Sequence, residues 1–250
     1  MEQSLHPNTD IVVLTLNNRQ VTQKFCGCIF PNTRDFHVYF VDNGSTDDTL
    51  QYLDRVADKH ENVTIIRNGE NRGVAGGRNI GVAAGTSEYV ICLDNDQFVE
   101  GDWLGSLFKV AKYYDLVGCD AWQMNPPSHA KPYWPSKHCV SKNDEFTYVG
   151  GGGTLIPRRV FEQIGMYDEE FNPMYFEDSD FYFRAAKAGF KAAWNFKHTV
   201  RHIGHQTIGS FKDSQRKAAF DRCYKLFVDK WKPYMPRNVF MGDLERLVKF

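Results

Sequence analysis

The sequence predicts an α/β fold whose core is a doubly wound, mostly parallel β-sheet. In the first half of the chain, short apolar runs rich in β-branched residues alternate with amphipathic segments, which is the pattern of strands connected by helices. Several of these runs end in Asp or Asn, and in such sheets ligands bind beyond the carboxyl ends of the strands. The 250 residues fit one large domain or two small ones and are ample for a hydrophobic core.

The first two expected strands are residues 10–16 and 36–41, both apolar and bounded by polar residues. A helix should follow the second strand, with Ser45 or Thr46 as its cap. Its first turn would carry the acids at 47–48, where the helix dipole favours negative charge. The apolar stripe of this helix consists of Leu50, Leu53, Val56 and Ala57.

Two more strands and two more helices complete the first half. Residues 62–68 and 88–94 read as strands, and the glycine-rich residues 71–85 read as a turn that enters a short helix. Asp102 is placed to cap a helix over residues 103–114.

Asn17, Asp42 and Asp94 each fall at the end of an expected strand. Since the carboxyl ends of parallel strands meet at one edge of a sheet, we expect one crevice to gather all three side chains.

The second half of the chain is less regular. It begins with a loop rich in Pro and aromatic residues, and it contains a run of four glycines, a helix opened by acids, a histidine-rich loop and an amphipathic helix. The expected segments are the loop 122–138, a strand or loop and a short helix within 146–165 that Gly165 closes, a helix within 175–190 that Gly189 closes, a strand and loop at 191–207, and a helix at 211–231.

Composition narrows the classes of function. A formal net charge of −1 excludes bulk nucleic-acid binding, and no apolar run is long enough for a membrane helix. Six cysteines without a CxxC pair indicate buried thiols in a reducing compartment. With no signal sequence visible, we expect a cytoplasmic protein, and peripheral attachment to the inner face of a membrane stays open.

Asp94-Asn95-Asp96 follows the fourth expected strand directly. The ordinary interpretation is a turn, because Asp and Asn form local hydrogen bonds to the backbone. The alternative is a cation site, since Mg²⁺ and Mn²⁺ bind one or two carboxylates together with substrate phosphates. An imidazole could complete such a site, and His198, His202 and His205 lie close together in the sequence.

Two further motifs have both a structural and a functional interpretation. Asp42 starts a turn, and it could also accept a hydrogen bond from the ring N–H of uracil or thymine. Glycine lets the backbone approach a ligand closely, so the segments 71–79 and 150–153 could border a nucleotide, with Arg78 beside its base or diphosphate. Flexible turns are the alternative for both segments.

Glu177, Asp178 and Asp180 stand at an expected helix start, where acids are common. One of them could be a general base, because a carboxylate near a helix N-terminus and a cation stays ionised at neutral pH. Asp178 and Asp180 are two residues apart, so they point in different directions, and at most one should face the crevice.

Taken in order, these motifs resemble the family 2 glycosyltransferases of the GT-A fold. The resemblance covers roughly residues 10–230 and implies a transfer of sugar from a nucleotide donor with inversion at the anomeric carbon. It further implies a glycosyltransferase domain at 1–210, divided into a nucleotide-binding half at about 10–96 and an acceptor and catalytic half at 97–210, with a helical extension at 211–250. The motifs are LTLNN, VDNGSTDDT, NRGVAGGRNIG, CLDND, GGGGTLIPRRVFEQIGMYDEEF, YFEDSDFYFRAAKAGF and VRHIGH.

The resemblance also implies residue roles. Asp178 matches the general base, and the other residues fall into three sets. The donor site would include Thr15, Asn17, Asp42, Asn43, Arg78, Asp94, Gly151 and Gly152; Mn²⁺ or Mg²⁺ would be held by Asp94, Asp96 and His202; and the acceptor would meet Glu177 and Trp122. The four glycines at 150–153 depart from the family's more usual single glycine with small neighbours.

The expected donor is a UDP- or dTDP-sugar, with a guanosine nucleotide still open, and the expected acceptor is a glycan or lipid-linked glycan that docks against the loop 122–139. The sequence as a whole, including its last expected helix, is similar to bacterial polysaccharide and rhamnosyl-type transferases. For the last helix, we expect packing on the core rather than contact with a membrane. A sugar nucleotidyltransferase is disfavoured, because the segment LTLNNRQ after the first strand lacks a glycine-rich basic loop. A retaining transferase and an inactive sugar- or nucleotide-binding module are the remaining alternatives.

Overall fold

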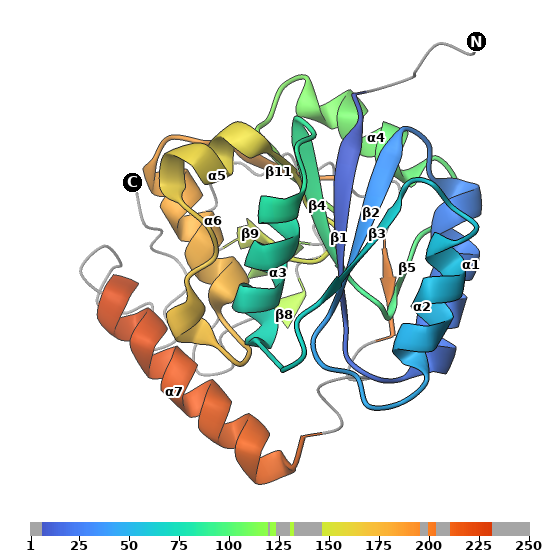
Figure 1. The fold of residues 1–250 in the computed structure, drawn as a ribbon. Helices are drawn as coiled ribbons and strands as arrows, with labels where there is room; N and C mark the ends of the chain where they lie inside the picture. Colours follow the sequence, from blue (N-terminus) through green and yellow to red (C-terminus); the bar gives the residue numbers. More distant parts are fainter. Residues whose placement is uncertain are drawn as a thin grey trace.

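The computed structural model describes residues 7–119, 121–123, 131–132, 147–195, 200–203 and 211–231, and it confirms the predicted fold class (Figure 1). Seven strands form a mixed sheet in the order β11-β6-β10-β4-β1-β2-β3. These strands are β1 (Thr9–Thr15), β2 (Phe36–Asp42), β3 (Val63–Arg67), β4 (Tyr89–Asp94), β6 (Leu116–Gly118), β10 (Leu155–Pro157) and β11 (Ala192–Trp194). The helices are α1 (Arg19–Asn32), α2 (Thr49–Ala57), α3 (Gly73–Ala84), α4 (Trp103–Ala111), α5 (Arg158–Ile164), α6 (Glu177–Lys187) and α7 (Asp213–Trp231), with a short 3-10 turn η1 (Glu169–Phe171).

The order of the strands places the candidate site. Strands β1, β2, β3 and β4 are parallel, and β1 lies between β2 and β4. Their carboxyl ends therefore share one edge of the sheet, as predicted. Strand β10 runs antiparallel between β4 and β6, which carries the chain back across the sheet from that edge.

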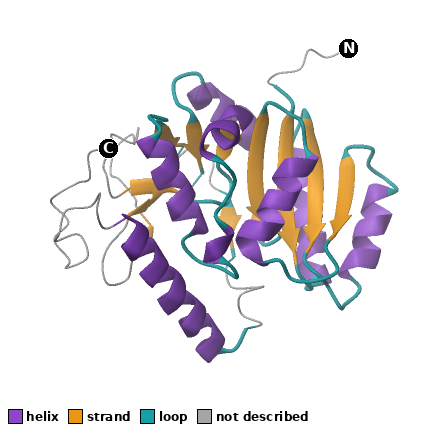
Figure 2. Ribbon diagram, turned by 60° about the vertical axis from the view of Figure 1, so that its left-hand side comes forward, coloured by secondary structure: helices purple, strands orange, loops and turns teal. Residues whose placement is uncertain are grey.

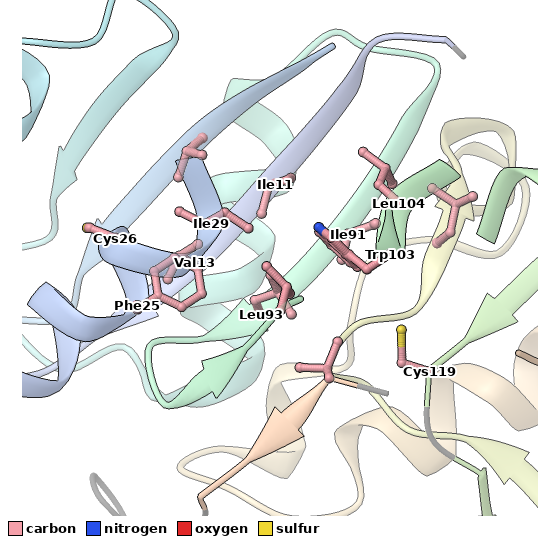
Figure 3. Packing of buried hydrophobic residues seen from close by; sticks show 14 of the residues in the cluster. Ile11, Val13, Phe25, Cys26, Ile29, Ile91, Leu93, Trp103, Leu104 and Cys119 are labelled. Carbon is pink, nitrogen blue, oxygen red and sulfur yellow. The ribbon is translucent and has the colours of Figure 1, made fainter. Parts of the chain in front are cut away.

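Helices cover both faces of the sheet, and successive residues of β1 point to opposite faces. Ile11 and Val13 pack with Phe25 of α1 and Trp103 of α4 in one core cluster, all of them fully buried (Figure 3). Val12 and Leu14 belong to the cluster on the other face, which α3, α5 and α6 cover. Because both faces of β1 are buried, its central residues 11–14 are continuously apolar rather than alternating.

The loop after β2 differs from the prediction. Helix α2 begins at Thr49, with Asp48 in the cap position, so the expected cap by Ser45 or Thr46 is wrong and the acids at 47–48 precede the first turn. The reason is competition for the two hydroxyl groups: Ser45 Oγ accepts from the backbone N–H of Asn17 at 2.8 Å, and Thr46 Oγ1 donates to Asn17 Oδ1 at 3.4 Å.

Other termini agree with the sequence. The Asp102 side chain caps α4, although this helix ends at Ala111 rather than at 114. Gly165, with φ of 83°, ends α5, and α6 begins at Glu177 with three acids in its first turn. Helix α1 was not predicted. Five cysteines lie in the described residues and all are free thiols, which agrees with the prediction for them.

Helix α7 packs on the protein, as predicted (Figure 2). Its buried residues Cys223, Phe227 and Trp231 form a cluster with Phe171 and with Phe183 of α6, among others. Within the described part of the chain, no helix has the length and apolar character needed to cross a membrane.

Candidate active site

The acidic motif lies where β4 reaches the edge of the sheet. Asp94 is the last residue of β4, and its backbone N–H donates to Gln97 Oε1 at 2.8 Å. Asn95 points into the core, where its Nδ2 donates to Thr22 Oγ1 of α1 at 2.8 Å. The middle residue of the motif thus anchors the turn, and the two aspartates on either side of it are left to bind a ligand.

A two-stranded sheet brings His202 to the same place. Strand β12 (Arg201–His202) pairs antiparallel with β5 (Gln97–Phe98), with His202 opposite Gln97. The N–H of Ile203 donates to the carbonyl oxygen of Asp96 at 3.1 Å, and His202 Nε2 lies 3.1 Å from Asp96 Oδ1. One ligand atom from each of Asp94, Asp96 and His202 lies within 4.8 Å of the others.

This group fits a divalent cation. Two carboxylates and one imidazole are ligands that Mn²⁺ accepts, and carboxylates are those that Mg²⁺ prefers. The Asp96 side chain is 6% exposed, whereas those of Asp94 and His202 are 34% and 38% exposed. The cluster is therefore fixed on one side by a buried aspartate and open on the other, where further oxygen ligands can approach.

Arg78 of α3 connects the acidic turn to the start of α6. Its side chain is only 5% exposed; Nη2 lies 3.4 Å from Asp94 Oδ1, and Nη1 lies 3.2 Å from Glu177 Oε1. Burial alone would lower the pKa of Arg78, but the two carboxylates raise it above its ordinary value. The guanidinium is a permanent cation between them. A contact of Arg78 with a donor stays a prediction.

Glu177 and Asp178 open α6 on the crevice side. Asp178 Oδ2 accepts from the N–H of Gly151 at 3.2 Å, and Oδ1 accepts from that of Ser179 at 2.7 Å. Burial, and next the charge of Asp178, raise the pKa of Glu177 to about 7, against the lowering effect of Arg78. Glu177 Oε2 has no hydrogen-bond partner among the described residues.

Asp180 turns the other way, as the helical spacing predicted. Its side chain is fully buried and accepts from Arg184 Nε at 2.8 Å and from Trp231 Nε1 at 2.9 Å. Asp180 therefore ties α6 to α7. Asp178 is the aspartate of this pair that lies beside Gly151.

The glycine wall, residues 150–153, closes the site opposite Arg78. A Cβ added to Gly151 would lie 2.7 Å from Arg78 Nη1 and 2.8 Å from Asp178 Cβ, and one added to Gly152 would collide with the Gln97 side chain. Only glycine allows these groups to meet. A close approach of this segment to a nucleotide stays a prediction.

The residues predicted for the nucleotide base lie at the ends of β1 and β2. Asp42 is buried and accepts from the N–H groups of Gly44 and Ser45, which leaves acceptor lone pairs on its carboxylate. Thr15 Oγ1 donates to the Val41 carbonyl oxygen at 3.3 Å. The Asn43 amide donates to the Gly73 carbonyl oxygen and accepts from Asn68, so it also braces the loops. Their role toward a base stays a prediction.

Some predicted positions lie outside what can be described. Trp122 lies in β7 (Ala121–Gln123), between β8 (Lys131–Pro132) and β9 (Thr147–Val149), and only its backbone is described. His198, His205 and most of the loop 122–139 fall outside the described residues.

Two residues of the site were missed. Gln97 holds the acidic turn, and the Asn172 side chain accepts from the N–H of Ala75 at the start of α3. Gln97 could have been predicted as a site residue, because it follows the acidic motif directly in the sequence. Asn172 gave none, because its partner is 97 residues away in the sequence.

Comparison with known proteins places the chain in a family. Residues 10–185 match Glycosyl transferase family 2, so the chain belongs to this family. The predicted resemblance is confirmed, and the sheet is that of GT-A glycosyltransferases.

The curated relatives are distant and match over part of their own length. The uncharacterized protein y4gI of Sinorhizobium fredii is 21% identical over 91% of this chain and 28% of its own length. An uncharacterized glycosyltransferase of Haemophilus influenzae is 29% identical over 34% of each chain. This chain thus spans about a third or less of these relatives.

Solved structures with this fold include glycosyltransferases in complex with nucleotides. Mannosyltransferase PcManGT from Pyrobaculum calidifontis, in complex with GDP-Man and Mn²⁺, has a TM-score of 0.66 at 17% identity, covering 91% of this chain and 68% of its own. GalNAc-T7 with UDP, GalNAc and Mn²⁺ has a TM-score of 0.70 at 15% identity, covering 91% and 50%. S. aureus TarS 1-349 with UDP-GlcNAc has a TM-score of 0.63 at 13% identity, covering 90% and 73%.

Proposed function

We propose that this protein is a metal-dependent inverting glycosyltransferase that moves a sugar from a nucleotide-diphosphate donor to a hydroxyl of a glycan or glycolipid. One observation carries the proposal: Asp94, Asp96 and His202 converge at the end of β4, and Arg78 links this cluster to Glu177, the neighbour of Asp178. A candidate cation site and a candidate base thus lie near the strand ends, where ligands bind in such sheets.

Asp94, Asp96 and His202 would hold Mn²⁺ or Mg²⁺. When bound, the ion supplies positive charge that stabilises the leaving diphosphate. The presence of Mn²⁺ with GDP-Man in PcManGT and with UDP in GalNAc-T7 supports this assignment.

Asp178 acts as the general base. Its carboxylate takes the proton of the acceptor hydroxyl, the acceptor oxygen bonds to the anomeric carbon, and the bond from that carbon to the donor phosphate breaks, with the electron pair leaving on the nucleoside diphosphate. Attack from the face opposite the leaving group inverts the anomeric centre. The hydrogen bonds from the N–H groups of Gly151 and Ser179 fix the direction of the carboxylate.

A uridine or thymidine diphosphate sugar is the favoured donor. Asp42 stands at the end of β2 with acceptor capacity left, and the ring N–H of uracil or thymine is a donor that it can bind. Two of the similar structures contain UDP or UDP-GlcNAc, while one contains GDP-Man, so guanosine donors belong in the same test.

A thermal-shift screen of nucleotide sugars tests the function. UDP-, dTDP- and GDP-sugars are added with Mn²⁺, with Mg²⁺ or with EDTA, and we expect stabilisation by uridine or thymidine donors that depends on the metal. The donor that stabilises most is then incubated with candidate acceptors, and NMR assigns the anomeric configuration of the product. Absence of any nucleotide-sugar binding would contradict the proposal, and a product with the donor's own configuration would show a retaining enzyme.

A further inference from the structure

Helix α7 lies beyond residues 10–185, the part of the chain that matches the family, yet it touches the loop that leads into the catalytic helix. Figure 1 shows α7 beside the segment between η1 and α6. That segment connects two parts of the site, since it is followed by Asp178 and it contains Asn172, which is bonded to the start of α3.

Two bulky residues before Glu177 have left-handed backbone conformations: φ is 80° at Tyr175 and 69° at Phe176. Such residues rarely adopt this conformation, and it persists only where the surroundings hold it. The surroundings here are largely rings of α7. The ring centroids of Tyr175 and Phe220 are 5.5 Å apart, and those of Phe176 and Phe227 are 5.3 Å apart.

Polar contacts from α7 hold the preceding backbone. Arg222 Nη1 donates to the carbonyl oxygen of Glu170 at 2.9 Å, and Nη2 donates to that of Asn172. The thiol of Cys223 donates to the carbonyl oxygen of Phe171 at 3.3 Å. Three consecutive carbonyl groups of the loop are thus bound by two adjacent residues of α7.

We infer that α7 is a positioning element of the active site and that Arg222 is its principal polar residue. By holding residues 170–172 and the left-handed pair at 175–176, α7 fixes the point where α6 starts, and with it the direction of Asp178. Through the Asn172 side chain, the same loop supports the first turn of α3. Arg78 belongs to this helix and lies further along it. This inference rests on the proposed function, in which Asp178 is the base.

Arg222→Ala tests the inference. Arg222→Lys should rescue part of the effect, because lysine keeps the positive charge but lacks the two guanidinium nitrogens that bind two carbonyl groups at once. Lys217→Ala is the matched control, since it removes a cation of the same helix whose partner is Asp221, one turn away. Three quantities are measured: turnover with the best donor of the screen, affinity for UDP with Mn²⁺ by calorimetry, and hydrogen–deuterium exchange of residues 168–180.

For Arg222→Ala we expect turnover to fall about tenfold or more, UDP–Mn²⁺ affinity to stay within about twofold, and exchange at 168–180 to rise while exchange in β1 and β4 stays as in the wild type. Arg222→Lys should be intermediate, and Lys217→Ala should match the wild type. Wild-type turnover in Arg222→Ala would overturn the inference, as would equal losses of turnover and UDP affinity, which indicate general destabilisation. Failure of the wild type to use any donor would instead contradict the proposed function. In that case the exchange experiment still tests the inference, because unchanged exchange at 168–180 in Arg222→Ala would overturn it.

Discussion

The strand ends of residues 10–96 and the segment 147–203 both contribute polar side chains to the candidate site, but they hold them differently. In the first region, Asp42 and Asn17 bind backbone N–H groups of neighbouring loops, and Asp94 is set by Gln97 three residues away. In the second region, Asp178 is bound by Gly151 and His202 is placed by its pairing with β5.

The difference shows how the two parts can serve different steps. In the first region, β1 and β4 are buried on both faces, and this packing holds the side chains at their carboxyl ends in place. The carboxylates at the start of α6 depend on partners from distant segments, such as Arg78 for Glu177, which is 99 residues away. Changes in the first region should therefore affect donor binding, and changes in the second should affect turnover.

The largest effect is expected from Asp178→Asn. The amide cannot accept the acceptor's proton, so turnover should fall by about 10²- to 10⁴-fold, the usual contribution of a general base. Donor affinity should change little, which calorimetry with UDP and Mn²⁺ can measure. Asp221→Asn, on the solvent side of α7, is the control. A mutant with near-normal turnover would remove Asp178 from the mechanism.

Stability should depend on a different ion pair, at the edge of the sheet opposite the site. Arg158 Nη2 lies 2.6 Å from Asp10 Oδ2, and the Asp10 side chain is 2% exposed. Arg158→Ala leaves a buried carboxylate without its cation and should lower the free energy of unfolding by about 3 kcal/mol. Urea denaturation measures the change.

The neighbouring residue supplies the control for that experiment. Arg159 pairs with Asp115 while its own side chain is 57% exposed, so Arg159→Ala should cost less than about 1 kcal/mol. Equal losses in the two variants would show that burial of Asp10 is not what makes the pair important.

The pH dependence of stability should report on Glu177. An unfolded glutamate has a pKa of about 4.3, and burial raises that of Glu177 to about 7 in the folded protein. The folded state therefore binds the proton more tightly, and the stability this adds below pH 4 is lost as pH rises to 7. The loss should be about 3 kcal/mol. Glu177→Gln cannot titrate and should show a flatter profile between pH 5 and 8; parallel profiles would contradict the shift.

The smallest effect is expected at the glycine wall. Gly151→Ala forces Arg78 and the Asp178 side chain apart, so turnover should fall about tenfold. Gly27→Ala is the matched control, because Gly27 lies in α1 with no atom within 4 Å of an added Cβ. It should retain activity and gain about 0.5–1 kcal/mol of stability. Equal activity of both variants would show that the close approach at Gly151 does not matter.

The same contrast explains what the sequence could predict. The strands and the acidic turn at Asp94 are encoded locally, by apolar runs that end in polar residues, and these predictions were confirmed. The Ser45 or Thr46 cap was wrong because Asn17, distant in the sequence, binds both hydroxyl groups. Helix α1 was missed because its buried positions include the polar Thr22 and it contains Pro31. The bracing by Asn172 and Arg222 depends on long-range contacts that no local pattern shows.

Calorimetry with Mn²⁺ and UDP tests the central claim most directly. Wild-type protein and the variants Asp94→Asn and Asp96→Asn are titrated with UDP in the presence of Mn²⁺ and again in EDTA. We expect the wild type to bind UDP tightly only with Mn²⁺, and both variants to lose at least about tenfold in UDP affinity in the presence of Mn²⁺. Equal UDP affinity in the wild type with and without Mn²⁺, or variants that bind as the wild type does, would contradict a cation site at the end of β4.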